Sequence, residues 1–197
     1  MPVADTRPQP LVLASGSARR RDLLRQIGIE PSHVDPPHID EHHGPRELPL
    51  AYAARMAREK LAVIAPKHSG CWVLAADTVV ACGRRILPKA ETEADALACL
   101  ALLSGRRHRV LGGIAIAGPD GRSAHRVVTT VVAFKRLTAT EIESYIATGD
   151  WHGKAGGYAI QGHAAAFIPW INGSYGNVVG LSLSDAVAML AGLGWRA

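Results

Sequence analysis

Hydrophobic positions along the chain form two kinds of pattern, short continuous runs and runs with helical spacing. The continuous and β-branched runs predict strands at residues 10–14, 71–82, 109–117 and 122–135. Apolar residues three or four positions apart predict helices between residues 17 and 28 and at 48–64, 92–103, 138–148 and 184–193. Strands and helices therefore mix along the chain, and we expect an α/β fold.

Turn and cap residues indicate where several of these elements begin or end. Gly118-Pro119-Asp120-Gly121 lies between two β-branched runs and predicts a β-hairpin. Ser17 and Thr92 precede two of the predicted helices, and we expect them to be N-caps. Residues 31–46 are rich in proline and histidine, which favours a loop with a short strand. Residues 153–180 are rich in glycine and small side chains, and we assign no helix or strand to them.

The composition is that of a globular protein with a basic surplus. Of the 197 residues, 48% are hydrophobic and 20% are charged, which is not typical of disorder. The 22 Lys and Arg residues exceed the 17 Asp and Glu residues by five, which favours an anionic partner such as a nucleotide, phosphate, nucleic acid or membrane surface. Because we find no repeat, low-complexity tract or linker, we expect a single domain over residues 1–197.

Other features bear on the compartment. No apolar run approaches the roughly 20 residues that span a bilayer, so we expect no membrane association through a transmembrane helix. Residues 1–10 lack a basic segment followed by an apolar one, so we expect no secretory signal. The three cysteines, Cys71, Cys82 and Cys99, are odd in number and form no C-x-x-C pair. This favours reduced thiols that pack in the interior. These features predict a cytoplasmic protein.

The first candidate site is the turn that follows the first predicted strand. Ser15, Gly16 and Ser17 lead into a helix whose first turn carries Arg19, Arg20 and Arg21. A helix N-terminus exposes free N–H groups to an anion, and arginine forks match phosphate oxygens. The alternative is a capped helix with a solvated basic turn. Cations at this end of a helix oppose its dipole, which favours the phosphate interpretation.

Two further candidates lie in the middle and in the last third of the chain. Asp77 interrupts an apolar strand, and a carboxylate there is either a structural ion-pair partner or a cleft residue that acts as a base or metal ligand. Residues 153–162, GKAGGYAIQG, contain four glycines, which indicate a close backbone approach or positive φ, as a binding loop needs; the alternative is merely a tight loop. The amide of Gln161 in this loop suits the edge of a nucleobase.

Taken together, these segments resemble the Maf family, the septum-formation-inhibitor or Maf-like proteins, which are nucleoside triphosphate pyrophosphatases. The similarity rests on the order and spacing of LASGSARRRDLL (13–24), HIDE (38–41), AREKLA (57–62), AADTVV (75–80), ILPK (86–89), GKAGGYAIQG (153–162) and NVVGLSL (177–183). There are departures, such as Ala18 where the family commonly has proline, but none removes a charged catalytic group.

The resemblance implies a fold and a reaction. The fold is a mixed twisted sheet with flanking helices, arranged as two lobes around a nucleotide-binding cleft. The reaction is hydrolysis between the α- and β-phosphates, with a divalent metal cation, Mg²⁺ or Mn²⁺. The tract GGYAIQG followed by INGSYGNVVGL is similar to the branch that acts on dTTP and UTP, and modified pyrimidine nucleotides are included in this expectation. The same reaction on 7-methyl-GTP is the alternative within the family.

The resemblance also implies roles for individual residues. Asp77 matches the family's proposed proton acceptor, and Glu41 and Asp77 are expected to hold the metal. Arg19, Thr78 and Gln161 match positions associated with substrate choice. The full set of expected substrate-binding residues is Ser15, Ser17, Arg19, Arg20, Lys60, Lys89, Thr78 and Gln161.

A protein of another class is the main rival hypothesis. Family members have been linked to septum formation, so a regulatory protein that binds nucleotide or nucleic acid is an alternative to an enzyme. The basic residues of this chain are not interleaved with stacking aromatic residues, as a single-strand binding surface requires. We therefore expect a nucleoside triphosphate and not a nucleic acid as the partner. The resemblance is also compatible with a homodimer.

Overall fold

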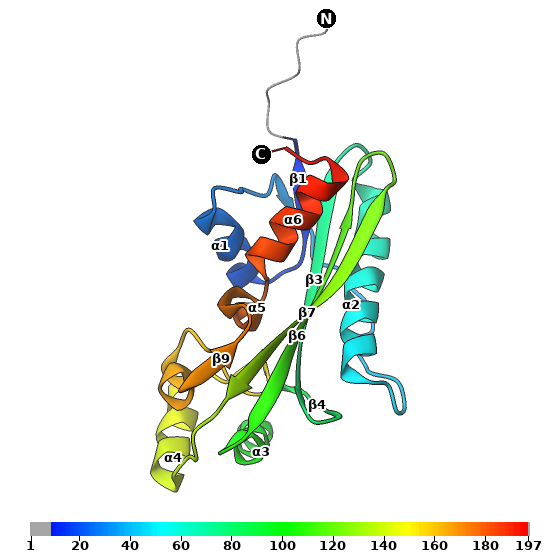
Figure 1. Ribbon diagram of the computed structural model, residues 1–197. Helices are drawn as coiled ribbons and strands as arrows, with labels where there is room; N and C mark the ends of the chain where they lie inside the picture. The colour runs from blue at the N-terminus through cyan, green and yellow to red at the C-terminus, as the bar shows by residue number, and fades with distance from the viewer. Residues whose placement is uncertain (1–8, 197) are drawn as a thin grey trace, which may run out of the picture.

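The computed structural model describes residues 9–196 and shows a seven-stranded mixed sheet with helices on both faces (Figure 1). The strands lie in the order β2-β1-β3-β6-β7-β9, and β4 pairs with β3. β1 is parallel to β2 and β3, whereas the other pairings are antiparallel. The expected α/β fold is confirmed. Residues 1–8 and 197 of the predicted domain, including most of the segment considered for a secretory signal, lie outside the described residues.

The strands agree with the hydrophobic runs and add short ones that the pattern did not predict. The sheet consists of β1 (Leu11–Ala14), β2 (His33–Val34), β3 (Trp72–Cys82), β4 (Arg85–Leu87), β6 (Arg107–Ala117), β7 (Ser123–Ala133) and β9 (Trp170–Asn172). A separate two-stranded ribbon pairs β5 (Lys89–Ala90) with β8 (Lys154–Ala155). The predicted hairpin is β6–β7, and its turn closes with a hydrogen bond from Gly121 N to Gly118 O.

The predicted helices are confirmed within a few residues. They are α1 (Ala18–Gln26), α2 (Pro49–Ile64), α3 (Glu93–Leu103), α4 (Ala139–Thr148) and α6 (Leu183–Leu193), and the structure adds α5 (Tyr175–Val179) with the 3₁₀ turns η1 (Ala65–Lys67) and η2 (His163–Phe167). Thr92 caps α3 in a reciprocal pair with Asp95, as its position predicts. Ser17 occupies the N-cap position of α1, but its side chain makes no capping hydrogen bond.

Alternating side chains of the strands build a core on each face of the sheet. In β1, Leu11 and Leu13 pack into the cluster formed with α1 and α6, while Val12 and Ala14 pack under α2. Figure 1 shows α2 along one face and α1 and α6 along the other. Within residues 9–196, no helix combines the length and hydrophobicity needed to cross a membrane.

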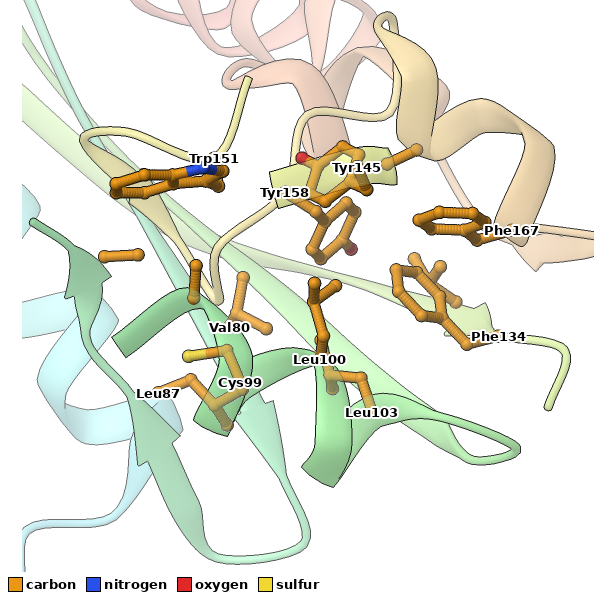
Figure 2. Close-up of a cluster of buried hydrophobic side chains, with 14 of the residues drawn as sticks. Val80, Leu87, Cys99, Leu100, Leu103, Phe134, Tyr145, Trp151, Tyr158 and Phe167 are labelled. Carbon is orange, nitrogen blue, oxygen red and sulfur yellow. The ribbon is translucent and has the colours of Figure 1, made fainter. Parts of the chain in front are cut away.

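A further core lies at the other end of the long strands, where α3 and α4 pack. The rings of Phe134, Tyr145, Tyr158 and Phe167 meet above Leu100 of α3 (Figure 2). The α1 end and this aromatic end of the molecule meet around the middle of β3. The candidate site lies at that junction, as the expectation of two lobes around a cleft requires.

Candidate functional site

A cleft of about 450 Å³ opens between the N-terminus of α1, the middle of β3 and the glycine-rich loop before η2. It brings together the full expected sets of substrate-binding and metal-binding residues, whereas Arg21 of the basic turn does not line it. The two sets together are Ser15, Ser17, Arg19, Arg20, Glu41, Lys60, Asp77, Thr78, Lys89 and Gln161. They come from segments up to 146 positions apart, since Gln161 follows Ser15 by that number (161 − 15).

The turn after β1 is organised around the guanidinium of Arg20. This side chain is only 8% exposed, and its Nε donates to Gly180 O at 2.9 Å. Its Nη1 donates to Ser15 Oγ at 2.7 Å and its Nη2 to Thr78 Oγ1 at 3.1 Å. Burial lowers the pKa of Arg20, and the nearby Asp77 carboxylate acts in the opposite direction. The arginine is therefore held in one orientation at the wall of the cleft.

Arg19 lies beside Arg20 and is held by the same segment of chain. Its Nε donates to Val179 O at 3.2 Å, next to the carbonyl that receives Arg20. Burial lowers the pKa of Arg19 as well. The first turn of α1 contains no acidic residue, so two cations stand at the positive end of a helix dipole. This is the local electrostatic arrangement that the sequence predicted for an anion site.

A row of alternating charges crosses the cleft beside the arginines. Lys60 of α2 is 5% exposed, and its Nζ lies 2.6 Å from Asp77 Oδ1 and 2.6 Å from Glu41 Oε1. Lys89 pairs with the second oxygen of Glu41. Burial would raise the pKa of Glu41, but the hydrogen bonds from the two lysines outweigh it and lower the pKa to about 2. Asp77 is therefore an ion-pair partner, as one alternative expected, and it also lies in the cleft, as the other alternative expected of a base or metal ligand.

The donor atoms of the cleft fit a divalent cation that takes some of its ligands from the protein and the others from the substrate and water. Glu41 and Asp77 present two carboxylates to the same cleft, with the Lys60 ammonium between them. In the described part of the chain, no group of three or more His, Cys, Asp or Glu side chains is placed to hold a metal. Mg²⁺ commonly uses one or two carboxylates together with substrate phosphates and water. The site fits that mode and not a cage made by protein alone.

The glycine-rich loop forms the opposite wall of the cleft. Gly156 has φ +70°, and a Cβ there would lie 2.8 Å from Val80 Cγ1, so both its conformation and its close approach to β3 require glycine. Tyr158 anchors the loop in the aromatic core, where its Oη lies 2.8 Å from Nε2 of the buried His108 (Figure 2 shows the Tyr158 ring). Gln161, at the end of the loop, is exposed at the cleft.

Lys154 is a cation of the cleft that the sequence reasoning missed. It lies on β8, it is partly buried, and its Nζ donates to His152 O at 2.9 Å. The pKa of Lys154 is lowered mainly by burial and further by the nearby positive charge of Arg19. The sequence indicates the glycine-rich loop, but no pattern in the sequence distinguishes its lysine as a site residue. The pairing of β8 with Lys89 and Ala90 of β5 is what brings this lysine to the site.

Comparisons with known proteins agree with the motifs. The family model described as Maf-like protein matches residues 10–193. A protein of Rhodospirillum rubrum named dTTP/UTP pyrophosphatase is 59% identical, with 95% of this chain and 89% of that protein covered. Proteins of the same name from Paramagnetospirillum magneticum and Caulobacter vibrioides are 60% and 58% identical, each over 94% of this chain and over 97% and 96% of their own lengths.

Two solved structures resemble part of the fold. One is a nucleoside-triphosphatase / dITP/XTP pyrophosphatase of Mycobacterium abscessus, with a TM-score of 0.42, 18% identity, and 66% of this chain and 75% of that chain covered. The other is the Ham1 protein of Staphylococcus aureus, with a TM-score of 0.43, 16% identity, and 64% of this chain and 72% of that chain covered.

Proposed function

This chain belongs to the Maf family, and on that premise we propose that it hydrolyses dTTP and UTP to the nucleoside monophosphate and pyrophosphate. The relatives that carry this name are 58–60% identical over nearly the whole chain. The observation that carries the proposal is the cleft itself, in which buried cations and two carboxylates face one space of about 450 Å³.

In this proposal the cations bind the triphosphate. Arg20 is fixed by three hydrogen bonds, so its remaining N–H groups meet a phosphate without a further loss of side-chain freedom. Arg19 of α1 and Lys154 of the glycine-rich loop, whose charges lie near each other, add positive charge to the cleft. The free N–H groups at the start of α1 add donors for phosphate oxygens.

Asp77 is the proposed general base. Lys60 fixes its Oδ1 and leaves the other carboxylate oxygen for a water molecule. Glu41 and Asp77 would hold the divalent cation, Mg²⁺ or Mn²⁺, and such a cation, when bound, neutralises phosphate charge and lowers the pKa of a coordinated water. Asp77 orients the attacking water and accepts its proton while the new oxygen–phosphorus bond forms at the α-phosphate. The bond from the α-phosphorus to the bridging oxygen breaks, and pyrophosphate leaves with that oxygen.

The nucleobase of the substrate is proposed to lie against the glycine-rich loop. The Gln161 amide can donate to one atom and accept from another, as the edge of thymine or uracil requires. Thr78 lines the cleft beside Arg20, whose Nη2 donates to the threonine hydroxyl, and that hydroxyl is also placed to donate to Gly180 O. These two side chains are the proposed determinants of substrate choice.

A pyrophosphate-release assay tests the proposal. The panel contains dTTP, UTP, CTP, the purine triphosphates and 7-methyl-GTP, each with Mg²⁺ and with Mn²⁺. We expect release from dTTP and UTP, a loss of at least a hundredfold in kcat for Asp77→Asn, and little change for Asp120→Asn, an exposed carboxylate in the β6–β7 turn. Release mainly from 7-methyl-GTP would contradict the substrate, and no release from any nucleotide would contradict the activity.

We further propose a cytoplasmic location and a homodimer. The cysteines of the described residues are all free, which suits a reducing compartment. Fractionation of cells that express the tagged chain tests the first proposal, and sedimentation equilibrium of the pure protein tests the second. Recovery outside the cytoplasm, or a monomer at micromolar concentration, would contradict them.

A further inference from the structure

Asn177 is a fully buried polar side chain that no step of the proposed reaction uses. It lies in α5, with 0% of its surface exposed. Its Nδ2 lies 3.1 Å from Val110 O of β6, 3.2 Å from Val128 O of β7 and 3.1 Å from Thr130 Oγ1 of β7. A single amide group thus attaches α5 to two neighbouring strands at the centre of the sheet.

The carbonyl end of the same side chain lies against a glycine. Asn177 Oδ1 is buried without a hydrogen-bond partner among the described residues, and a Cβ at Gly112 would lie 1.9 Å from it. A Cα hydrogen of Gly112 takes the place of that Cβ and faces the oxygen, which is a weak contact. A buried oxygen without a strong partner is costly. Asparagine is therefore a poor choice for packing alone, and its value at this position lies in the bonds that Nδ2 makes.

A second set of bonds holds the beginning of α5. Ser174 Oγ accepts from Asn177 N at 3.1 Å and caps the helix. Ser174 N in turn donates to Thr130 Oγ1 at 3.1 Å. A helix of five residues is not stable by itself, so these bonds decide where it lies. We call Thr130, Ser174 and Asn177 the α5 lock.

The other end of α5 leads directly to the arginines of the cleft. Val179 O accepts from Arg19 Nε at 3.2 Å, and Gly180 O accepts from Arg20 Nε at 2.9 Å. These carbonyls come two and three residues after Asn177. The lock, the short helix and the two guanidinium groups therefore form one continuous series of contacts from the central strands to the cleft.

We propose that Asn177 is a positioning residue for triphosphate binding, which acts by fixing the carbonyls of Val179 and Gly180 that orient Arg19 and Arg20. The inference rests on the proposed function, because it assigns a determinant of substrate binding in the same cleft. An arginine fork recognises a phosphate only when its plane is held within about 0.5 Å and 10–20° of the right geometry. Loosening α5 therefore weakens phosphate binding without removing any group that touches the substrate.

The test uses Asn177→Ala together with a milder pair at another member of the lock. Thr130→Val removes the hydroxyl that accepts hydrogen bonds from Asn177 Nδ2 and Ser174 N, and it keeps the β-branched shape. Thr130→Ser keeps the hydroxyl. Thr138→Ala, which removes the cap of α4 away from the cleft, is the control for a general loss of stability. KM and kcat for dTTP and UTP are measured with each chain, and the affinity for inorganic pyrophosphate is measured by calorimetry, all well below the lowest melting temperature.

We expect Asn177→Ala and Thr130→Val to raise KM and to weaken pyrophosphate binding at least tenfold, with a change of less than threefold in kcat, because the lost interaction is made in the ground state as well. Thr130→Ser should restore both values. If Asn177→Ala does not fold, the Thr130 pair decides the question.

Three results would overturn the inference: wild-type KM and pyrophosphate affinity in folded Asn177→Ala and Thr130→Val, no rescue by Thr130→Ser, or an equal effect of Thr138→Ala. If the wild-type chain cleaves neither dTTP nor UTP, the proposed function fails. The pyrophosphate affinities then still test the lock separately.

Discussion

Acid should destabilise this protein through one buried histidine. His108 of β6 is 2% exposed and packs edge-on against the rings of Phe134 and Tyr158. Its Nε2 lies 2.8 Å from Tyr158 Oη, and its Nδ1 is buried without a partner among residues 9–196. Burial lowers the pKa of His108 from its ordinary 6.5 to about 4. The side chain is therefore neutral in the folded protein at pH 5, where an unfolded histidine is mostly protonated.

The sign and size of the effect follow from this difference. Between pH 6.5 and pH 4 the unfolded chain binds more protons at His108 than the folded chain, so the free energy of unfolding falls as the pH falls. Integration of the two titrations from pH 7.5 to pH 5.0 gives a loss of about 2 kcal/mol from this residue. That is a large share of the 5–15 kcal/mol that stabilises a typical domain.

Urea unfolding at pH 7.5 and pH 5.0 measures the loss in the wild-type chain and in His108→Gln. Glutamine does not titrate and retains an amide for Tyr158, so the wild type should lose about 2 kcal/mol more than the variant between the two pH values. His125→Gln, at an exposed position of β7, is the matched control and should keep the wild-type loss. Equal losses in the wild type and His108→Gln would refute the reasoning, because the titrating group would then lie elsewhere.

Three further predictions concern the charge row, the sheet and a cap. Lys60→Met removes one of the two ammonium groups that lower the pKa of Glu41 to about 2, so that pKa should rise, and a value still near 2 by NMR titration would contradict this role. Gly112→Ala places a Cβ 1.9 Å from Asn177 Oδ1 and should lower the free energy of unfolding by about 1–3 kcal/mol in urea, whereas an unchanged midpoint would contradict the close contact. Thr92→Ala should cost about 1 kcal/mol in the same assay with kcat and KM unchanged, since it removes only the cap of α3.

The elements that the sequence predicted well are those with strong local signals. The β6–β7 hairpin follows from its turn residues and the α3 cap from Thr92, and both are formed by contacts between near neighbours. Several missed elements, such as α5 and β9, lie in residues 153–180, where glycine and small side chains hide any periodicity. These elements are held by distant partners. β9 pairs with β7, and α5 depends on Asn177 bonds to strands 49 and 67 positions away.

The site was predictable in its parts but not in its connections. The residues alone indicated the phosphate turn, the unusual Asp77 and the glycine-rich loop, and the family resemblance supplied Glu41 and the lysines. What the chain pattern could not decide was whether Asp77 is an ion-pair partner or a cleft residue. The answer depends on Lys60, which comes from a helix on one face of the sheet and reaches Asp77 on a central strand. No local sequence pattern predicts a contact between a helix residue and a strand residue of this kind.

The arrangement of charges explains how a cleft with so many buried ionic groups remains stable before a substrate binds. Asp77, Lys60, Glu41 and Lys89 alternate in sign, so each member offsets much of its neighbour's desolvation cost. Arg19 and Lys154 make no ion pair with any of residues 9–196, and burial lowers the pKa of both. The uncompensated charge of the cleft is therefore positive and is concentrated where Arg19 of α1 and Lys154 of β8 lie near each other. A polyanion gains most by placing its phosphates there, beside a charge row that is already balanced and holds Asp77 in place.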